Sequence, residues 1–100
     1  MAGSVRLVFR QELARALGLD PRLSAITCSL EQGDRLADIL PRLAAKNPAI
    51  STKVYDPEIQ QINSLVQISI NGRLLSLFGG IEAPLADGDR VLIFFAAGGG

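Results

Sequence analysis

The sequence contains no histidine, no tryptophan and a single cysteine, Cys28. Without histidine, the histidine-dependent catalytic triads and the usual zinc sites are excluded. One cysteine cannot form an internal disulfide, so Cys28 is interpreted as a small residue that fills the core. No cluster of catalytic or metal-ligating residue types stands out either. We therefore expect no catalytic residues, no metal site and no bound cofactor in this chain, which argues against a stand-alone enzyme.

The sequence also lacks net charge and long apolar runs. Ten basic residues balance ten acidic ones, which removes the attraction that drives non-specific binding to nucleic acid or to an anionic membrane. No run reaches the length of a membrane span, and the N-terminus lacks the basic start and apolar stretch of a secretory signal. We therefore expect a cytoplasmic protein whose partners are other proteins, with neither nucleic acid nor membrane among them.

The N-terminal half begins with two predicted strands. Apolar and polar residues alternate over 5–10, which predicts a strand whose buried face is formed by Val5, Leu7 and Phe9. A short helix is predicted over 11–17, where good helix formers precede Gly18. Residues 25–31 alternate again and predict a second strand, antiparallel to the first. This alternation places Cys28 on the buried face of the second strand.

The main helix is predicted after Asp34, which can cap it. Pro41 lies inside this helix and predicts a kink or a shortened first segment, and Asn47-Pro48 ends it. The segment 49–65 has no clear period, and a single helical turn is predicted over 58–63. The apolar stripe that would cross the sheet consists of Leu36, Ile39, Leu40 and Leu43.

The C-terminal half predicts three more strands. Residues 66–70 alternate and lead into Asn71-Gly72, the dipeptide that best tolerates a tight hairpin turn. A return strand is predicted over 74–77, and the closing strand over 90–95. Two strands, a helix and three strands form the element order of an α+β fold of the β-grasp type. In that fold a mixed sheet of four to five strands packs on one main helix, with the closing strand parallel to the first.

The closing strand passes directly into two alanines and three glycines. We therefore predict a folded domain over 1–95 and a flexible tail over 96–100. Glycine has no Cβ and can pass through a channel that is too narrow for side chains. Five extended residues span about 17 Å, enough to carry the carboxylate of Gly100 into the active site of another protein.

Apolar residues of the first and closing strands also fall on the side of the sheet away from the core. Exposed apolar patches commonly mark protein interfaces, and aromatic residues are favoured anchors there. A basic residue beside the patch would help to orient an acidic partner. The alternative is that the insert 49–65 covers this face and makes these residues a secondary core. The predicted partner-binding residues are Val8, Arg90, Leu92, Phe94 and Phe95.

Three stretches together resemble one known family. VQISING at 66–72, PLADGDRV at 84–91 and the terminal Gly99-Gly100 are similar to the ubiquitin-like sulfur carriers. That family includes the small subunit of molybdopterin synthase and the sulfur carrier of thiazole synthesis. The long segment 49–65 and the run over 77–81 are most similar to carriers that deliver sulfur to a cysteine synthase.

The resemblance implies that an E1-like enzyme adenylates the carboxylate of Gly100 with ATP and magnesium, before conversion to a thiocarboxylate. Gly98 and Gly99 would then belong to the tail that visits both enzymes. The acceptor would be the large subunit of molybdopterin synthase, a thiazole synthase or a cysteine synthase. The chain itself would be a substrate or the small subunit of a synthase complex.

Two alternatives remain open at the level of sequence. The first is a ubiquitin-like protein modifier that is joined to lysines through Gly100, because the same adenylate serves both reactions. The second is a non-covalent β-grasp interaction module with an inert tail.

Overall fold

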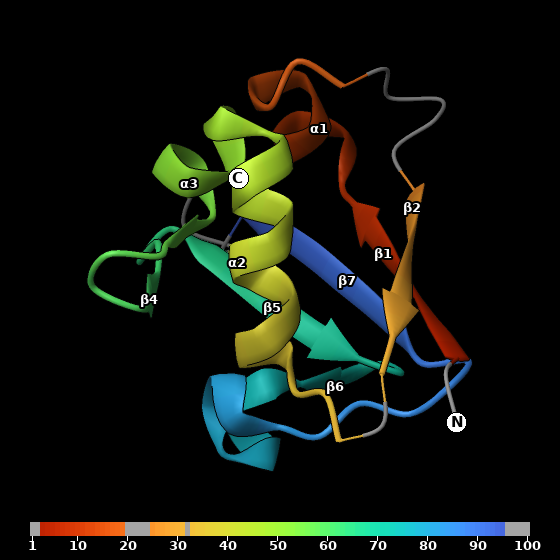
Figure 1. Cartoon of the computed structure of the whole chain (residues 1–100). Helices are drawn as coiled ribbons and strands as arrows, with labels where there is room; N and C mark the ends of the chain where they lie inside the picture. The colour runs from red at the N-terminus through yellow and green to blue at the C-terminus, as the bar shows by residue number, and fades with distance from the viewer. Residues whose placement is uncertain (1–2, 20–24, 32, 96–100) are drawn as a thin grey trace.

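The computed structural model describes residues 3–19, 25–31 and 33–95. A five-stranded mixed sheet has the strand order β2-β1-β7-β5-β6. Helix α2 (Leu36–Lys46) lies across one face of this sheet, in front of β5 and β7 in Figure 1. This arrangement confirms the predicted β-grasp fold. The strands are β1 (Gly3–Phe9), β2 (Ala25–Leu30), β5 (Val66–Ile70), β6 (Arg73–Leu74) and β7 (Arg90–Phe95).

The closing strand β7 lies at the centre of the sheet, between β1 and β5. It runs parallel to β1, with Leu7 opposite Val91, and antiparallel to β5, with Ile68 opposite Ile93. Strand β2 pairs with β1 in antiparallel orientation, as predicted. The residues that pair across β1 and β7 lie more than eighty positions apart in the sequence. Two parallel strands need a crossover connection, and here the helices and strands between β1 and β7 form it.

The core lies between the sheet and α2. In the middle of β1 and β7 alternate residues are buried, and these residues belong to one core with the buried stripe of the helix. The predicted inward face of β1 and the predicted helical stripe are both confirmed. Helix α1 (Gln11–Ala16) closes the core at one end and is followed by Gly18 with φ +77°. The central buried residues are Val5, Leu7, Phe9, Leu36, Ile39, Leu40, Leu43, Val91 and Ile93.

Strand β2 is less buried than the alternation suggested. Cys28 lies on the core side but is only half-buried. The reason is the position of β2 at the edge of the sheet, where β1 is its one neighbour in the described part of the chain. The interpretation of Cys28 as a residue that packs against the core holds, but the expected full burial was wrong.

The start of α2 differs from the prediction. Arg35, and not Asp34, occupies the N-cap position, and Asp38 accepts a hydrogen bond from the Arg35 N–H at 2.8 Å. Helix α2 is continuous across Pro41, so the shortened first segment was also wrong. Asn47 ends the helix as predicted and caps the next one, because its side chain accepts from the Ala49 N–H at 3.1 Å.

The insert after α2 contains α3 (Pro48–Lys53) and a small hairpin of β3 (Tyr55–Asp56) and β4 (Gln61–Ile62). The helical turn predicted over 58–63 was wrong. Instead, Asp56 accepts from the Glu58 N–H at 2.9 Å and the chain turns back on itself.

The insert widens the helix layer. Ile50, Val54 and Tyr55 are buried in the main core, and α3 lies beside α2 in Figure 1. The alternative in which this segment covers the other face of the sheet is therefore wrong for the described residues.

The hairpin after β5 is confirmed, with φ +52° at Asn71 and +85° at Gly72. The predicted return strand is shorter than expected, because it ends at Leu74. Leu75 is buried, and its turn toward the core begins a 3-10 turn over Leu75–Phe78. A second 3-10 turn follows over Gly80–Glu82.

Neighbouring residues of β7 provide a test of the two faces. Ile93 is fully buried under α2, whereas Leu92 is half-buried on the opposite face. We expect Ile93→Ala to lower the free energy of unfolding by roughly 2–5 kcal/mol because it leaves a core cavity. The matched variant Leu92→Ala should lose at least about 1 kcal/mol less. Urea unfolding measures both variants, and equal losses would contradict the assignment of faces.

Candidate protein-docking site

The sheet face opposite α2 is the candidate site, and we call it the open face. The strand registers place alternate residues of the sheet on it, because side chains in a strand point to opposite faces in turn. Its described residues are Ser4, Arg6, Val8 and Arg10, then Ala25, Thr27 and Ser29, then Gln67, Ser69 and Leu74, and finally Arg90, Leu92 and Phe94.

An apolar strip runs along the centre of the open face. Val8 lies opposite Leu92 in the parallel pair, and Phe94 follows two residues later. All three side chains are half-buried. The structure therefore brings together the apolar residues that the sequence grouped. Their role in binding a partner remains a prediction.

Phe95 does not belong to this strip. It lies opposite Val66 at the end of the antiparallel pair and packs against the core. Since Phe94 and Phe95 are consecutive in one strand, they point to opposite faces. The grouping of Phe95 with the predicted partner-binding residues therefore does not match its position in the sheet.

Arginines stand at both ends of the apolar strip. Arg6 lies opposite Arg90, and both side chains are exposed. At the other end, the guanidinium carbon of Arg10 lies 5.9 Å from the centroid of the Phe94 ring, within the range of a cation–π interaction. Sequence reasoning named Arg90 but not Arg6 or Arg10. The signal was available, because both arginines alternate with the buried residues of the first strand.

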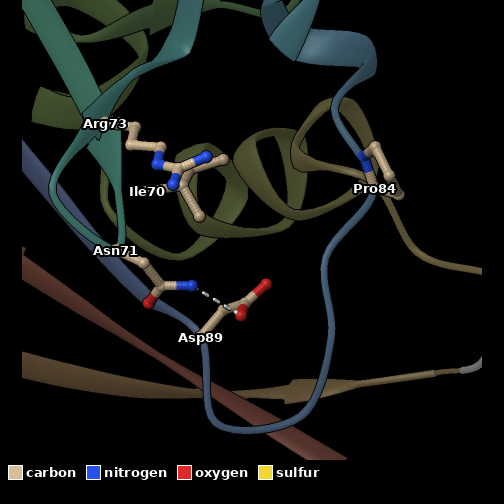
Figure 2. A pocket seen from close by; sticks show the side chains of 5 residues that line it. All are labelled: Ile70, Asn71, Arg73, Pro84 and Asp89. Carbon is tan, nitrogen blue, oxygen red and sulfur yellow. Dashed lines mark hydrogen bonds between the residues drawn. The ribbon is translucent and has the colours of Figure 1, made fainter. Parts of the chain in front are cut away.

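The acidic residues nearest to this face hold the fold together. Asp87 accepts from the Ser4 N–H at 2.8 Å. Asp89 accepts from the side chain of Asn71 at 2.9 Å, and Figure 2 shows this bond. Asn71 in turn accepts from the Arg90 N–H at 3.0 Å. The acidic motif before β7 thus fastens the start of that strand to β1 and to the Asn71-Gly72 hairpin.

A pocket of about 320 Å³ lies beside this motif (Figure 2). It is at the start of β7, about 17 Å along the strand from Phe95. Two of its polar side chains bond to each other, so they are already satisfied without a ligand. We assign no binding role to this pocket, which is lined by Ile70, Asn71, Arg73, Pro84 and Asp89.

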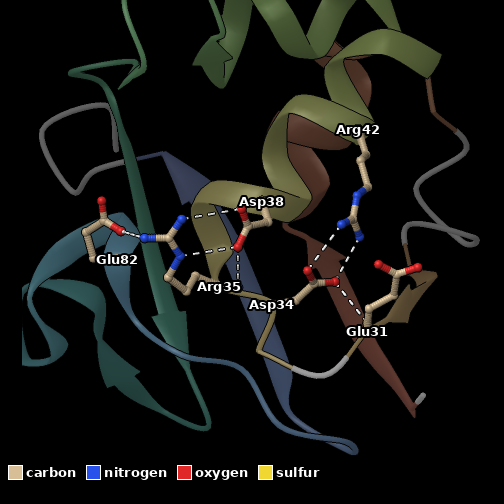
Figure 3. Close-up of polar contacts among 6 residues, drawn as sticks. All are labelled: Glu31, Asp34, Arg35, Asp38, Arg42 and Glu82. Atoms are coloured by element: carbon tan, nitrogen blue, oxygen red, sulfur yellow. Dashed lines mark hydrogen bonds and ion pairs between the residues drawn. The ribbon is translucent and has the colours of Figure 1, made fainter. Parts of the chain in front are cut away.

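A cluster of charged groups anchors the start of α2 (Figure 3). The two terminal guanidinium nitrogens of Arg42, Nη1 and Nη2, donate to the buried carboxylate of Asp34, at 2.9 and 3.1 Å. The N–H of Glu31 donates to the same carboxylate at 2.9 Å. A second arginine, Arg35, bonds to Asp38 and to Glu82.

The hydrogen bonds within this cluster shift its titration. The hydrogen bond from Arg42, followed by that from the Glu31 N–H, lowers the pKa of Asp34 below its ordinary value of 3.8. Arg35 lowers the pKa of Asp38 chiefly by hydrogen bonding to its side chain. The charged groups of the cluster pair with one another. Their arrangement is therefore explained by the anchoring of α2, and we assign no ligand to it.

We also searched the described residues for a metal site and for a membrane-spanning helix. No group of three or more His, Cys, Asp or Glu that could hold a metal ion occurs among them. Within the same residues, no helix has both the length and the apolar character needed to cross a membrane. Gly98, Gly99 and Gly100 lie outside the described residues.

Comparison with known proteins decides the family. The sequence model of the ThiS family matches residues 11–100. This chain belongs to the ThiS family. The resemblance to ubiquitin-like sulfur carriers is thereby confirmed. Relatives of this ThiS-family chain include the sulfur carrier protein CysO of Mycobacterium tuberculosis. It is 33% identical over 69 residues, which cover 68% of this chain and 74% of the relative.

Solved structures share the fold over nearly the whole ThiS-family chain. The crystal structure of CysO from Mycobacterium tuberculosis has a TM-score of 0.70 and 26% identity, covering 93% of this chain and 99% of that one. SAMP1 from Haloferax volcanii has a TM-score of 0.75 and 19% identity, covering 98% of this chain and 100% of that one. The latter likeness concerns the fold alone.

The Asp34–Arg42 pair generates a pH prediction. Because the pKa of Asp34 is lowered in the folded state, the unfolded chain binds more protons between the two pKa values, and stability rises with pH in that window. The pair therefore stabilises fully above pH 3.8, and its contribution is lost as the pH falls through the lowered pKa. Asp34→Asn should be less stable than wild type at neutral pH, and the difference should disappear in acid.

Arg42→Gln is the second variant, because it removes the cation whose hydrogen bond lowers the pKa of Asp34. Urea unfolding at a series of pH values measures wild type, both single variants and the double variant. The double variant should lose less stability than the sum of the single losses, since both remove the same pair. A difference for Asp34→Asn that stays constant down to low pH would contradict the assignment.

Proposed function

We propose that this protein is a sulfur carrier whose reactive group is the carboxylate of Gly100. The observation that carries the proposal is the family match, which extends through residue 100, together with the CysO relatives. The structure is consistent with it, because β7 ends at Phe95, directly before the alanines and glycines. A central strand anchors the start of this segment in the sheet.

The proposed chemistry begins with activation of the carboxylate. A carboxylate is a poor acyl donor, because its leaving group would be oxide. An E1-like enzyme with ATP and Mg²⁺ would convert Gly100 into an acyl adenylate and release pyrophosphate. Hydrosulfide would then attack the carbonyl carbon, form the C–S bond and expel AMP, leaving a thiocarboxylate and a proton. No redox step is required for this exchange.

In this scheme the folded domain is the part that the partner enzymes bind, and it catalyses nothing itself. Residues 96–100 could place the reactive carbon about 17 Å beyond β7, inside the active site of another enzyme. Holding the tail in that site would supply the positioning on which the reaction depends. Because activation consumes ATP, the proposal also places the protein in the cytoplasm.

We propose an enzyme of the cysteine synthase class as the first candidate acceptor. The support is the similarity to CysO sulfur carriers and the resemblance of 49–65 and 77–81 to carriers of that class. The large subunit of molybdopterin synthase and thiazole synthase are the comparison acceptors. Sulfur transfer from the thiocarboxylated chain to each purified acceptor would rank the three.

The first test is chemical. Incubation with an E1-like enzyme, ATP, Mg²⁺ and sulfide should replace one oxygen of the chain by sulfur, as measured by intact-mass spectrometry. Deletion of Gly99 and Gly100 should abolish the change, because the new terminal carboxylate, on Gly98, would fall about 7 Å short of the position that the Gly100 carboxylate reaches. Appending tryptophan after Gly100 should also abolish it, because the carboxylate then sits on a bulky residue. Undiminished exchange in either variant would contradict the proposal.

The same deletion separates a sulfur carrier from a protein modifier. In a cell lysate, a modifier forms higher-mass conjugates that vanish when Gly99 and Gly100 are removed. Such conjugates without any sulfur exchange would replace the carrier proposal by the modifier.

A further inference from the structure

We propose that the outer edge of β2 is an interface between two copies of this chain. In this pairing the β2 strands of the two copies lie side by side in antiparallel orientation, about a twofold axis at Thr27. The two five-stranded sheets then continue into one another. The inference goes beyond the proposed function and does not depend on Gly100.

The hydrogen bonds of β1 indicate which of its backbone groups turn toward β2. The N–H of Arg6 donates to the C=O of Asp89 at 3.0 Å, and the C=O of Ser4 accepts from the N–H of Gly88 at 2.8 Å. Even-numbered residues of β1 therefore turn their backbone groups to the side of β7. The N–H and C=O of one residue point to the same edge of a strand, and this edge alternates from residue to residue. Odd-numbered residues of β1 therefore bond to β2.

The register of β1 and β2 extends this pattern to the outer edge. Val5 lies opposite Cys28 and Leu7 opposite Ile26, so these are hydrogen-bonded pairs. The residues of β2 between them direct their N–H and C=O away from β1. In the part of the chain that the structure describes, no residue bonds to these outward backbone groups. The outward residues are Ala25, Thr27 and Ser29.

The two edges of the sheet differ in their protection against pairing with another molecule. Protected edge strands are short or carry charge, proline or a bulge. Strand β6, at one edge, has two residues, and one of them is Arg73. Strand β2 has six residues without charge or proline, and its pairing with β1 runs without a bulge. It is the outermost strand on the side of β1 in Figure 1, and its outer edge is unprotected.

A second copy of this chain fits this edge because the pairing is self-complementary. With Thr27 opposite Thr27 of the second copy, Ala25 lies opposite Ser29, and the outward groups of both strands meet. Arg6 lies opposite Thr27 within each chain. The Arg6 residues of the two copies are therefore three strand spacings, about 14 Å, apart. That distance exceeds the Debye length of about 8 Å at physiological salt, so their repulsion is screened.

The same register covers apolar side chains beside the edge. Ile26 and Cys28 are half-buried and pack against the core. In the dimer, Ile26 of each copy lies opposite Cys28 of the other, so both side chains lose contact with water. The interface is small, so we expect a transient dimer. Because β1 lies between β2 and β7, the pairing does not involve β7.

Amide hydrogen exchange, measured by NMR, tests the edge directly. The N–H groups of Thr27 and Ser29 should exchange about threefold or more slowly at about 1 mM protein than at about 10 μM, because pairing removes them from water. The N–H groups of Ile26 and Cys28 bond to β1 at both concentrations, so their exchange should change less.

Disulfide trapping tests the register. Ile26→Cys places a thiol opposite Cys28 of the other copy, with Cα atoms about 4.5 Å apart, which a disulfide can bridge. This variant should form a covalent dimer in an oxidising glutathione buffer. Wild type should not, because its two Cys28 residues lie on a diagonal, about 7–8 Å apart. The control Ile26→Cys/Cys28→Ser should form none for the same reason.

A charge at the twofold axis tests self-pairing. Thr27→Lys sets two like charges directly opposite each other and should raise the dissociation constant of the dimer by about tenfold or more in sedimentation equilibrium. The matched control Thr52→Lys makes the same change at an exposed residue of α3 and should keep the dissociation constant of wild type. Urea unfolding of dilute samples verifies that each variant is folded.

Several outcomes would overturn the inference. These are a mass that stays monomeric up to about 1 mM, equal effects of Thr27→Lys and Thr52→Lys, or concentration-dependent exchange at other amides only. Covalent dimers of wild type as abundant as those of Ile26→Cys would contradict the register. Slower exchange at Thr27 and Ser29 only after a partner enzyme is added would replace the second copy by that enzyme. Deletion of Gly99 and Gly100 should leave the dimer intact, so failure of sulfur exchange and failure of this pairing are distinguishable.

Discussion

The parallel pairing of β1 with β7 is the constraint on which the rest of the structure depends. Its register sets Leu7 beside Val91 under α2, and on the other face it sets Val8 beside Leu92. One pairing therefore builds the middle of the core and the middle of the open face. It also anchors the strand that leads into residues 96–100, because a central strand is hydrogen-bonded on both sides.

The arginines of the open face and the acidic residues that anchor the fold have different tasks in this neutral chain. Asp34, Asp87 and Asp89 accept hydrogen bonds from the chain's own donors and fasten α2, β1 and the hairpin before β7. The arginines of β1 and β7 lie on the open face. Net charge thus describes the open face poorly, because its described positions hold arginines but no Asp or Glu. A neutral protein can present a surface that carries charge of one sign.

The errors in the sequence reasoning have identifiable physical causes. Segment 49–65 forms one short helix and strands of two residues, which are too short to show a period. Its position is decided by Ile50 and Tyr55, which enter the core beside α2. Phe95 is a different case, because simple alternation already places it on the same side as Ile93. Half-burial of Cys28 follows from the edge position of β2, which the residues of that strand do not reveal.

The sequence by itself determined the alternating faces of β1 and β7, the stripe of α2, the Asn71-Gly72 turn and the fold class. These features depend on local periodicity or on the backbone preferences of single residues, so they can be read from neighbouring positions. Only the tertiary structure decided that Arg6 lies opposite Arg90, that Asp34 pairs with Arg42 and that the insert joins the helix layer. Such contacts join residues from different elements, and their geometry is set by the register of strands and the packing of helices.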